Sequence, residues 1–531
     1  ALSSGNYVLQ VKSESTICKY EYYVDHKNIR PLNSKESPVP YKICSFDIEA
    51  SSSHGDFPLA RKSYRKMLRE IITYWNKNKS EISKMDRSSK KNLFKKLVFT
   101  AFEFENKGEI SKVYLKKRHN SITKGELNNI LEKYLELNDN GNPKYPLGLL
   151  LKKNKRMEEK DKRLDDEDDE EEIVARNKKW HPVGPKILFK KDILFCLNYD
   201  FDAGDKLGIL DRALEYNREE KLIAGFLPEL EGDKCTFIGS TFLKSGDIEP
   251  YLNHCVVLNS CEDTRDVPNS IIESYDTEGE MLLGWRDIIQ KEDPDIIIGY
   301  NIFGFDYVFM HTRSQELDIE DDFMKLSRNR RSKSRLMEKQ IRIASGTHNL
   351  KYITMEGRIQ IDLYNHFRRE VNLPSYKLDY VASHFIGDYV KEVEKGENYT
   401  KFKSYNLTGL QRHNFISFEL IGHSSDKYKH KGKKKFKVIE MNEREGWFKV
   451  GEELDFEEGK KIRWGLAKDD VTPQDIFRLT NGDARDRAII AKYCFQDCNL
   501  VHHIFRKNDI LTGFIEIANV CSVPIDYIVM R

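Results

Sequence analysis

The chain has 531 residues, of which 33% are charged and 39% are hydrophobic, and its formal net charge is +2. This length allows about two to four domains with hydrophobic cores, and no run approaches the ~20 apolar residues that a transmembrane helix needs. The small net charge excludes a uniformly basic nucleic-acid-binding protein, so any such surface is a local patch. The nine cysteines form no C-x-x-C pair, and their odd number argues against a complete disulfide framework. We therefore expect an intracellular protein.

The N-terminal residues lead into one short apolar strand. Two β-like runs and a connector rich in Pro and Ser make residues 1–40 the expected end of an N-terminal domain. The stretch YKICSFDIEA, Tyr41 to Ala50, is typical of a buried strand, in which Asp47 and Glu49 point to the same face. Two adjacent carboxylates beside a buried strand repel each other unless a cation lies between them. The alternative is a frayed strand end whose acids face water.

Residues 61–230 differ in composition from the sequence on either side. Helical patterns rich in Lys, Glu and Asn alternate with polar linkers, and Asp165–Glu172 is a run of eight acids. Such a run repels itself, which predicts a disordered or solvated segment, although it could also mimic nucleic acid or hold a partner. We predict a charged, partly helical insertion.

Strand and helix patterns resume at about residue 231. CTFIGSTF and YLNHCVVL predict two strands, the apolar spacing of residues 278–290 predicts an amphipathic helix, and GRIQIDL predicts a further strand that ends near Asp362. Residues 398–469 contain alternating strand patterns, which predict a β-rich insertion. The apolar segment 522–530, SVPIDYIVM, is strand-like.

Polar residues follow the most apolar of these predicted strands. The run from Asp295 to Gly299 ends just before Asn301, Phe305 and Asp306. Open α/β sheets bind ligands at the carboxyl ends of their strands, so these three residues are placed where a site would lie. The alternatives are that Asp306 caps the next helix and that Phe305 belongs to the core.

A late helix carries the last candidate residues. Tyr493 and Asp497 are four positions apart, so they lie one turn from each other on one helix face. The alternative is a hydrogen bond between the two side chains. Four carboxylates that meet at one end of a mixed sheet can hold two divalent ions, and such a pair can activate water and stabilise the leaving oxygen of a phosphodiester.

These patterns together resemble the 3′-5′ exonuclease domain of family B DNA polymerases, an α/β fold of the ribonuclease-H type with a mixed sheet and flanking helices. SFDIEA resembles the first motif, GYNIFGFD the second and YCFQD the third, with GDFP, TFIGSTF, ESYDTEGEMLLGW, GRIQIDL and SYKLDYVA between them in the family's order. The resemblance implies an exonuclease domain at 41–60 and 231–520. The long insertion and the phrase LPELEGDKCTFIGSTF are most similar to polymerases of large double-stranded DNA viruses of eukaryotes, related to the delta type.

The resemblance also implies roles for the candidate residues. Asp47, Glu49 and Asp497 would bind the first Mg²⁺ or Mn²⁺ ion, and Asp47 with Asp306 would hold the second. Tyr493 would orient the attacking water.

Two further residues are implied to contact DNA. Phe305 would pack against the frayed 3′-terminal base, and Asn301 would hydrogen-bond the strand. Asp362 is assigned a supporting, structural role.

The polymerase palm motifs of the family, of the types D-x-x-S-L-Y-P-S and Y-G-D-T-D-S, do not occur in this sequence. We therefore expect the N-terminal part of a longer replicative polymerase, with residues 521–531 beginning the connection to the palm. Its implied partners are DNA, a C-terminal polymerase domain and a processivity factor, and its implied location is the nucleus or a cytoplasmic site of viral replication. The alternatives are a free-standing exonuclease and a catalytically silent scaffold that binds DNA or a replication protein.

Overall fold

The computed structural model divides into two compact units, residues 1–60 with 233–531 and residues 61–232. The residues that it describes are 7–9, 15–18, 20–29, 39–52, 56–106, 110–116, 122–136, 193–198, 203–204, 206–208, 210–211, 227–264, 267–343, 346–422, 427–429, 434–457, 459–467 and 471–530. The acidic run Asp165–Glu172 lies outside them. Among the helices in these ranges, none is both long and apolar enough to cross a membrane.

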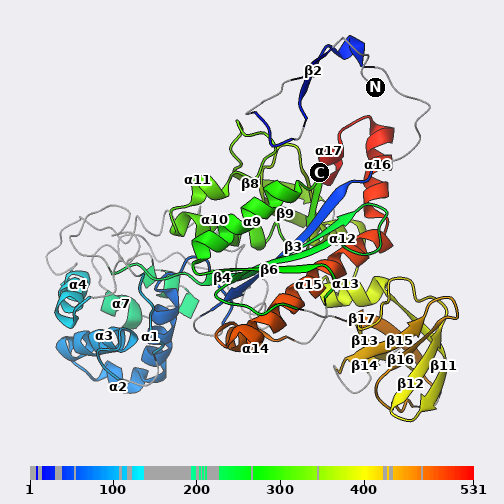
Figure 1. Cartoon of the computed structure of the whole chain (residues 1–531). Coiled ribbons are helices and arrows are strands. Elements are labelled where there is room, and N and C mark those ends of the chain that lie inside the picture. Colours follow the sequence, from blue (N-terminus) through cyan, green and yellow to red (C-terminus); the bar gives the residue numbers. More distant parts are fainter. Residues whose placement is uncertain are drawn as a thin grey trace. The chain divides into compact units, whose positions relative to one another are not determined.

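A six-stranded mixed sheet lies at the centre of the larger unit (Figure 1). In spatial order its strands are β10 (Ile359–Asp362), β7 (Ile296–Gly299), β3 (Lys42–Ser51), β4 (Lys234–Lys244), β5 (Leu252–Leu258) and β6 (Ser270–Tyr275). The pairs β10–β7, β7–β3 and β5–β6 are parallel, whereas β4 is antiparallel to both β3 and β5. The mixed α/β architecture expected from the sequence is confirmed.

Helices cover both faces of this sheet. On one face α9 (Glu278–Glu292) and α10 (Asp306–Glu316) pack against Phe46 and Ile297, and on the other α15 (Ala484–Lys507) packs against Phe237. Alternate residues of β3 and β7 therefore enter two different apolar clusters. Burial of each large apolar side chain stabilises the fold by about 1.5–3 kcal/mol, so the strand that carries Asp47 is held firmly in place.

Side-chain caps fix where the helices begin. The Asp483 carboxylate accepts hydrogen bonds from the backbone N–H groups of Arg485 and Asp486, which forms a capping box at the start of α15. The Thr277 hydroxyl accepts a hydrogen bond from the Glu280 backbone N–H at the start of α9. Such caps satisfy N–H groups that have no partner within the helix.

Shorter elements complete the larger unit. They are β1 (Tyr7–Leu9), β2 (Tyr22–Val24), the 3₁₀ helix η1 (His26–Asn28), α11 (Glu320–Phe323), the hairpin β8 (Leu336–Ile343) and β9 (Gly346–Ile353), α12 (Leu363–Glu370), α13 (Leu378–Phe385), α14 (Pro473–Thr480), α16 (Ile510–Cys521) and α17 (Ile525–Val529).

The strand-like character expected for residues 522–530 was wrong, because this segment contains helix α17. Pro524 has an extended conformation at its N-cap, and Asp526 lies in the first turn, where an anion is favoured. The helix buries Val529 in the same apolar cluster as Ile361. Tertiary packing therefore overrides the local β-branched composition.

A closed β-barrel is inserted between α13 and α14. Its strands are β11 (Gly387–Gly396), β12 (Tyr399–Ser404), β13 (Phe415–Ile421), β15 (Phe436–Asn442), β16 (Trp447–Val450) and β17 (Lys461–Ala467), with β14 (Lys427–Lys429) added beside β13. Pairing of β13 with β17 closes the barrel. The barrel includes β11, which lies before the range 398–469 expected for the β-rich insertion.

The smaller unit is helical in its described part. Its helices are α1 (Arg65–Lys77), α2 (Lys79–Ser83), α3 (Arg87–Ala101), α4 (Lys124–Glu136) and α7 (Ile193–Asn198). They share one apolar cluster that includes Ile71, Trp75 and Leu97. This unit therefore has its own hydrophobic core.

Candidate metal centre

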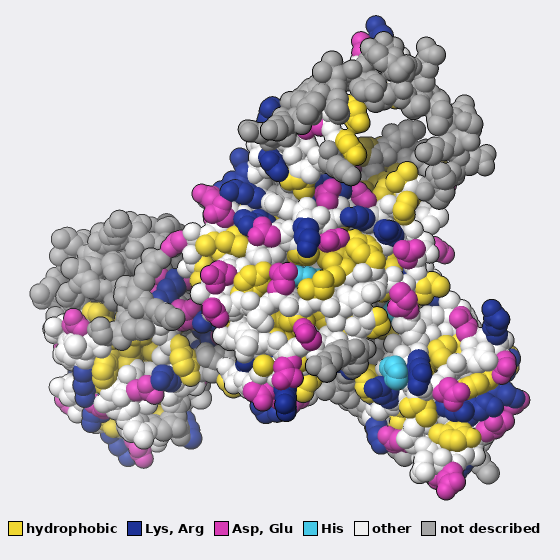
Figure 2. Space-filling model, in the orientation of Figure 1, with side chains coloured by type: hydrophobic (Ala, Val, Ile, Leu, Met, Phe, Trp, Pro, Cys, Tyr) yellow, Lys and Arg dark blue, Asp and Glu magenta, His cyan; other side chains and the backbone are white. Residues whose placement is uncertain are grey.

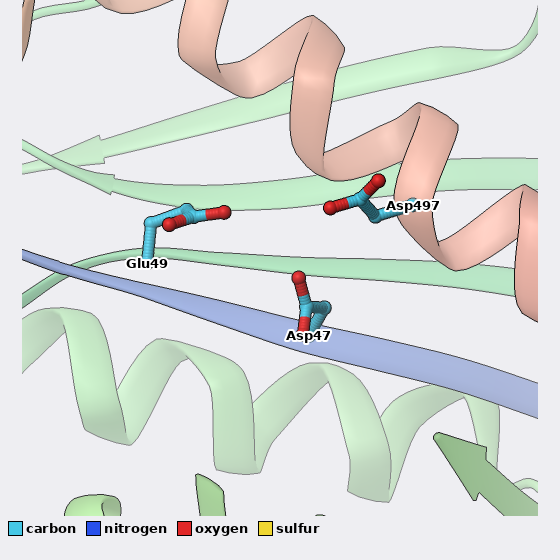
Figure 3. A group of neighbouring side chains, drawn as sticks. All are labelled: Asp47, Glu49 and Asp497. Carbon is cyan, nitrogen blue, oxygen red and sulfur yellow. The ribbon is translucent and has the colours of Figure 1, made fainter. Parts of the chain in front are cut away.

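Three carboxylates from distant parts of the chain meet beside the central strand. One carboxylate oxygen from each of Asp47, Glu49 and Asp497 lies within 4.8 Å of the others. Asp47 and Glu49 come from the same face of β3, and Asp497 comes from α15, which crosses that face (Figure 3). Asp497 is 2% exposed. The structure thus brings together three of the four predicted acids.

A close approach of α15 to the sheet makes this convergence possible. Gly239 of β4 is the register partner of Asp47 on β3. A Cβ atom added at Gly239 would lie 2.7 Å from Cβ of Cys494, a separation that real contacts do not allow. The missing side chain therefore lets α15 pack directly over the strand pair and brings Asp497, one turn further along the helix, to Asp47.

The fourth predicted acid, Asp306, lies next to this group at the first turn of α10. Its Oδ1 accepts a hydrogen bond of 3.2 Å from the Ile48 backbone N–H, between the two acids of β3. It is 3% exposed, and burial together with the negative charge of Asp47 raises the pKa of Asp306 well above its usual value. Phe305 holds the N-cap position of α10, so Asp306 is the first helical residue and does not cap the helix.

Asp362 organises the loop that leads into α10. Its Oδ1 accepts hydrogen bonds from the backbone N–H groups of Asn301 (2.8 Å) and Tyr364 (3.0 Å), and its Oδ2 from the backbone N–H of Phe303 (3.0 Å) and Nδ2 of Asn365 (2.8 Å). Burial raises the pKa of Asp362 to about 6, although these four donors oppose the shift. This carboxylate ties the end of β10 to the loop between β7 and α10.

The two residues predicted to contact DNA differ in their surroundings. The Asn301 backbone has φ 63°, and a Cβ on Gly304 would lie 2.1 Å from the Asn301 Oδ1 atom, so the side chain lies over Gly304 inside the loop. Phe305 is half-buried, with its ring centroid 5.4 Å from that of Phe57 and 5.3 Å from that of Phe309.

Phe57 is an aromatic residue for which the sequence patterns predicted no role. It is 55% exposed and packs edge-on against Phe305, next to Asp306 in sequence. Its position in the GDFP stretch after β3 is a sequence signal that could have identified it, because an aromatic residue in a turn-rich loop is poorly explained by core packing.

Tyr493 lies one turn before Asp497 on α15 and is 4% exposed. Its i, i+4 relation to Asp497 is as predicted. The role expected for it stays a prediction.

The composition of this centre fits hard divalent cations. Carboxylate oxygens are the ligands that Mg²⁺ and Mn²⁺ prefer, and three such oxygens are gathered in one place. The raised pKa of Asp306 arises from burial beside another anion, and a cation at this position would relieve that repulsion. We therefore regard Asp47, Glu49 and Asp497 as a candidate metal centre, with Asp306 at its edge.

Residues 212–381 match the sequence model described as "DNA polymerase family B, exonuclease domain". That range includes β4 to β10 and Asp306, whereas β3 and α15 lie outside it.

The chain is also similar to three curated proteins. It is 38% identical to the DNA polymerase of Phaeocystis pouchetii virus, over 99% of this chain and 50% of that protein. It is 31% identical to the DNA polymerase of Pyramimonas orientalis virus, over 100% of this chain and 39% of that protein. It is 33% identical to the DNA polymerase delta catalytic subunit of Candida albicans, over 34% of this chain and 17% of that protein. The chain therefore spans half or less of the length of these relatives.

Proposed function

We propose, on the premise that this chain carries the exonuclease domain of family B DNA polymerases, that the domain removes nucleotides from the 3′ end of DNA by metal-dependent hydrolysis. The observation that carries the proposal is the meeting of Asp47, Glu49 and Asp497 at one point beside the central strand. We assign the larger unit, without its barrel, to the ribonuclease-H type of fold on the same premise.

The four acids have distinct tasks in this proposal. Asp47, Glu49 and Asp497 would hold one Mg²⁺ or Mn²⁺ ion, and Asp47 with Asp306 would hold a second. When bound, the ions supply an activated water and stabilise the charge that develops on the leaving oxygen. The N-terminal position of Asp306 on α10 favours its anionic form once a cation offsets Asp47.

Other residues of the chain position the reactants. The Tyr493 hydroxyl orients the attacking water by hydrogen bonding and is not a nucleophile. Asp362 keeps the β7–α10 loop in one conformation, because its carboxylate accepts hydrogen bonds from the backbone N–H groups of Asn301 and Phe303 in this loop. Preorganisation of this kind holds Asp306 and Phe305 where the DNA end is to bind.

Aromatic side chains would hold the single-stranded end. Phe57 and Phe305 form a partly exposed pair of rings, and Phe305 directly precedes Asp306 in the sequence. Stacking of unpaired bases on such rings contributes about 1–3 kcal/mol per base. This favours a frayed 3′ end, from which a mismatched nucleotide would be removed, over a paired end.

The same premise leads to a proposal for the complete protein. We propose that it is a replicative, proofreading DNA polymerase of a DNA virus, related to the delta type, which works with a processivity factor at an intracellular replication site. The similarity of the chain to two viral DNA polymerases over nearly its whole length supports this proposal.

The decisive experiment uses a single-stranded oligonucleotide labelled once at its 3′ end and once at its 5′ end. With Mg²⁺ or Mn²⁺ we expect immediate release of labelled mononucleotide from the 3′ label, a ladder of shortened products from the 5′ label, and no reaction in EDTA. The variant Tyr493→Phe should release mononucleotides about tenfold more slowly, because one lost hydrogen bond of about 1 kcal/mol corresponds to nearly that change in rate. Absence of metal-dependent release, or cleavage inside the strand, would refute the proposal.

A further inference from the structure

The first helices of the smaller unit carry a large excess of positive charge. From Arg61 to Ala101 the sequence contains thirteen Lys or Arg residues but three acids, Glu70, Glu81 and Asp86. In the whole chain the two classes are almost equal, with 88 Lys or Arg and 86 Asp or Glu residues. The excess is therefore a property of this stretch and not of the overall composition, and it creates a local positive potential.

Most of the basic side chains lie on the outside of a packed helical unit, whereas Lys95 is buried. The apolar residues of α1 and α3, among them Trp75 and Leu97, form the core of this unit. Lys84 and Lys96 are exposed and Lys90 is half-buried. Figure 2 shows Lys and Arg side chains along the lower rim of the unit in which Figure 1 labels α1 to α4. The charge is thus presented by an ordered surface.

Two of the three acids in this stretch serve local structure. Glu70 accepts hydrogen bonds from the backbone N–H and the hydroxyl of Ser111, both of 2.6 Å. Asp86 caps α3 by accepting a hydrogen bond from the Ser89 backbone N–H. Glu70 and Asp86 are therefore explained by folding. Among the basic residues, Arg65 pairs with Asp211 and Lys95 with Glu132. Lys84, Lys90 and Lys96 add positive charge at the surface of these helices.

The surface offers phosphate contacts, whereas its aromatic rings are buried or, for Tyr64 and Tyr74, half-buried against the core of the unit. Between Arg61 and Ala101, all of which the structure describes, Met85 at 37% is the exposed large apolar side chain, while Trp75, Phe94 and Phe99 are buried. Proteins that hold single strands combine basic grooves with exposed aromatic rings, whereas Lys and Arg alone suffice to bind the phosphates of a duplex.

We infer that the surface of α1, α2 and α3 binds the phosphate backbone of duplex DNA without reading its sequence. This role is independent of the nuclease proposal, because it uses other residues in the other unit. Binding of this kind would raise the affinity of the whole chain for primer–template DNA, and it would weaken steeply with salt.

The test compares two triple variants of the full chain. In the first, Lys84→Gln, Lys90→Gln and Lys96→Gln remove three charges from the inferred surface. Binding of a fluorescein-labelled duplex of about 20 base pairs is followed by anisotropy in EDTA, which prevents hydrolysis, at several NaCl concentrations. We expect about tenfold weaker binding at low salt and a decrease of about 2–3 in the slope of log K against log salt.

The second triple, Lys391→Gln, Lys395→Gln and Lys461→Gln, removes the same charge from exposed positions on the barrel. It should change affinity less than twofold. Equal losses in both triples, or no loss in the first, would overturn the inference. Circular dichroism checks that both variants are folded, and release of nucleotides from a short single strand should be unchanged in both, which separates this result from any failure of the nuclease proposal.

The chain contains one competing polyanion, the acids of residues 165–172. A further variant replaces these acids by their amides. If the first triple weakens DNA binding only in this background, the acidic run is the normal occupant of the surface and the inference is wrong. If the triple weakens binding equally in both backgrounds, DNA is the occupant.

Discussion

The larger unit places its carboxylates in two contrasting environments. Glu278 forms an ion pair with Arg313, with the shortest N–O distance 2.6 Å, and Asp362 accepts four hydrogen bonds from N–H groups. Asp47, Glu49 and Asp497 instead lie against one another. The first group is matched by donors of the protein itself, whereas in the second group three carboxylates approach within 4.8 Å of one another.

Under the proposed function, this difference separates acids that stabilise the fold from acids that are arranged for a ligand. Burial of a carboxylate with its donors is nearly neutral in free energy, whereas crowding of carboxylates costs free energy unless a cation is added. Removal of Glu278 from its pair with Arg313 should therefore destabilise the fold, whereas removal of one of the crowded acids should not, and the first two predictions below test that contrast.

The largest effect is expected for Asp47→Asn. Nuclease activity should fall about 1,000-fold, equivalent to about 4 kcal/mol of transition-state stabilisation, because this acid belongs to both proposed ion sites. Without metal the free energy of unfolding should not decrease, since one of several crowded charges is removed. The stabilisation that Mn²⁺ gives the parent in a thermal melt should be lost.

The exposed barrel substitution Glu394→Gln is the control for Asp47→Asn, because it removes one charge far from the acids in sequence. Activity of Asp47→Asn within threefold of the parent would contradict the metal assignment. An equal stabilisation of Asp47→Asn and the parent by Mn²⁺ in a thermal melt would also contradict the metal assignment.

The next largest effect is expected for Glu278→Gln, which should destabilise the fold. Its partner Arg313 has a side chain that is 1% exposed, and the substitution leaves that guanidinium without a matching charge. Breaking a buried pair on one side costs about 3–5 kcal/mol, measurable as a lower urea midpoint of unfolding. The control Asp322→Asn breaks the exposed pair with Lys325 and should leave the urea midpoint nearly unchanged. Equal urea midpoints for the two variants would show that the buried pair stabilises the fold no more than the exposed pair does.

Much of the site was predictable because it depends on local periodicity. The alternation of β3 predicted that Asp47 and Glu49 share a face, and helical spacing predicted that Tyr493 and Asp497 do. The place of Asp306 after β7 followed from the ends of parallel strands.

What could not be predicted depends on contacts between distant residues. The matching of Glu278 with Arg313, the packing of Cys494 over Gly239 and the closure of the barrel by β13 and β17 have no local signature. Helix α17 was missed for the same reason, since its burial against distant residues decides its conformation.

Asp362→Asn tests how the charge of a buried carboxylate that accepts four hydrogen bonds affects the stability of the fold. Because burial raises the pKa of Asp362 to about 6 from 3.8, the folded state binds this proton more tightly than the unfolded state does. The parent should therefore lose stability as pH rises from about 4 to 6, by an amount on the order of 3 kcal/mol, and the variant should not. The negative charge of Asp362 contributes to the raised pKa values of Asp306, Tyr300 and Tyr307, and the variant retains all three groups.

Asp362→Asn should remove this loss of stability, but it should lower nuclease activity. An asparagine turns an NH₂ group toward two of the four donors, so the loop before Asp306 loses order, and nuclease activity at neutral pH should fall about tenfold. The substitution Asp287→Asn on the exposed side of α9 controls for the loss of one acid. An equal loss of stability in variant and parent between pH 4 and 7 would contradict this assignment.

The smallest effect on stability is expected for Gly239→Ala, which tests the packing that joins the two acid-bearing elements. The added methyl group would meet Cβ of Cys494 at 2.7 Å and the Cys494 backbone at 3.3 Å, so α15 must move away from β4. Overpacking of this kind costs about 1–3 kcal/mol. The control is Gly513→Ala in α16, where an added Cβ meets nothing within 4 Å, and it should raise stability by about 0.5–1 kcal/mol through helix propensity.

Because Asp497 moves with α15, Gly239→Ala should lower nuclease activity about 100-fold, far beyond its effect on the urea midpoint. Activity that falls only in proportion to the folded fraction would mean that the acids tolerate a displaced helix, and the contrast between crowded and matched carboxylates would then lose its geometric basis.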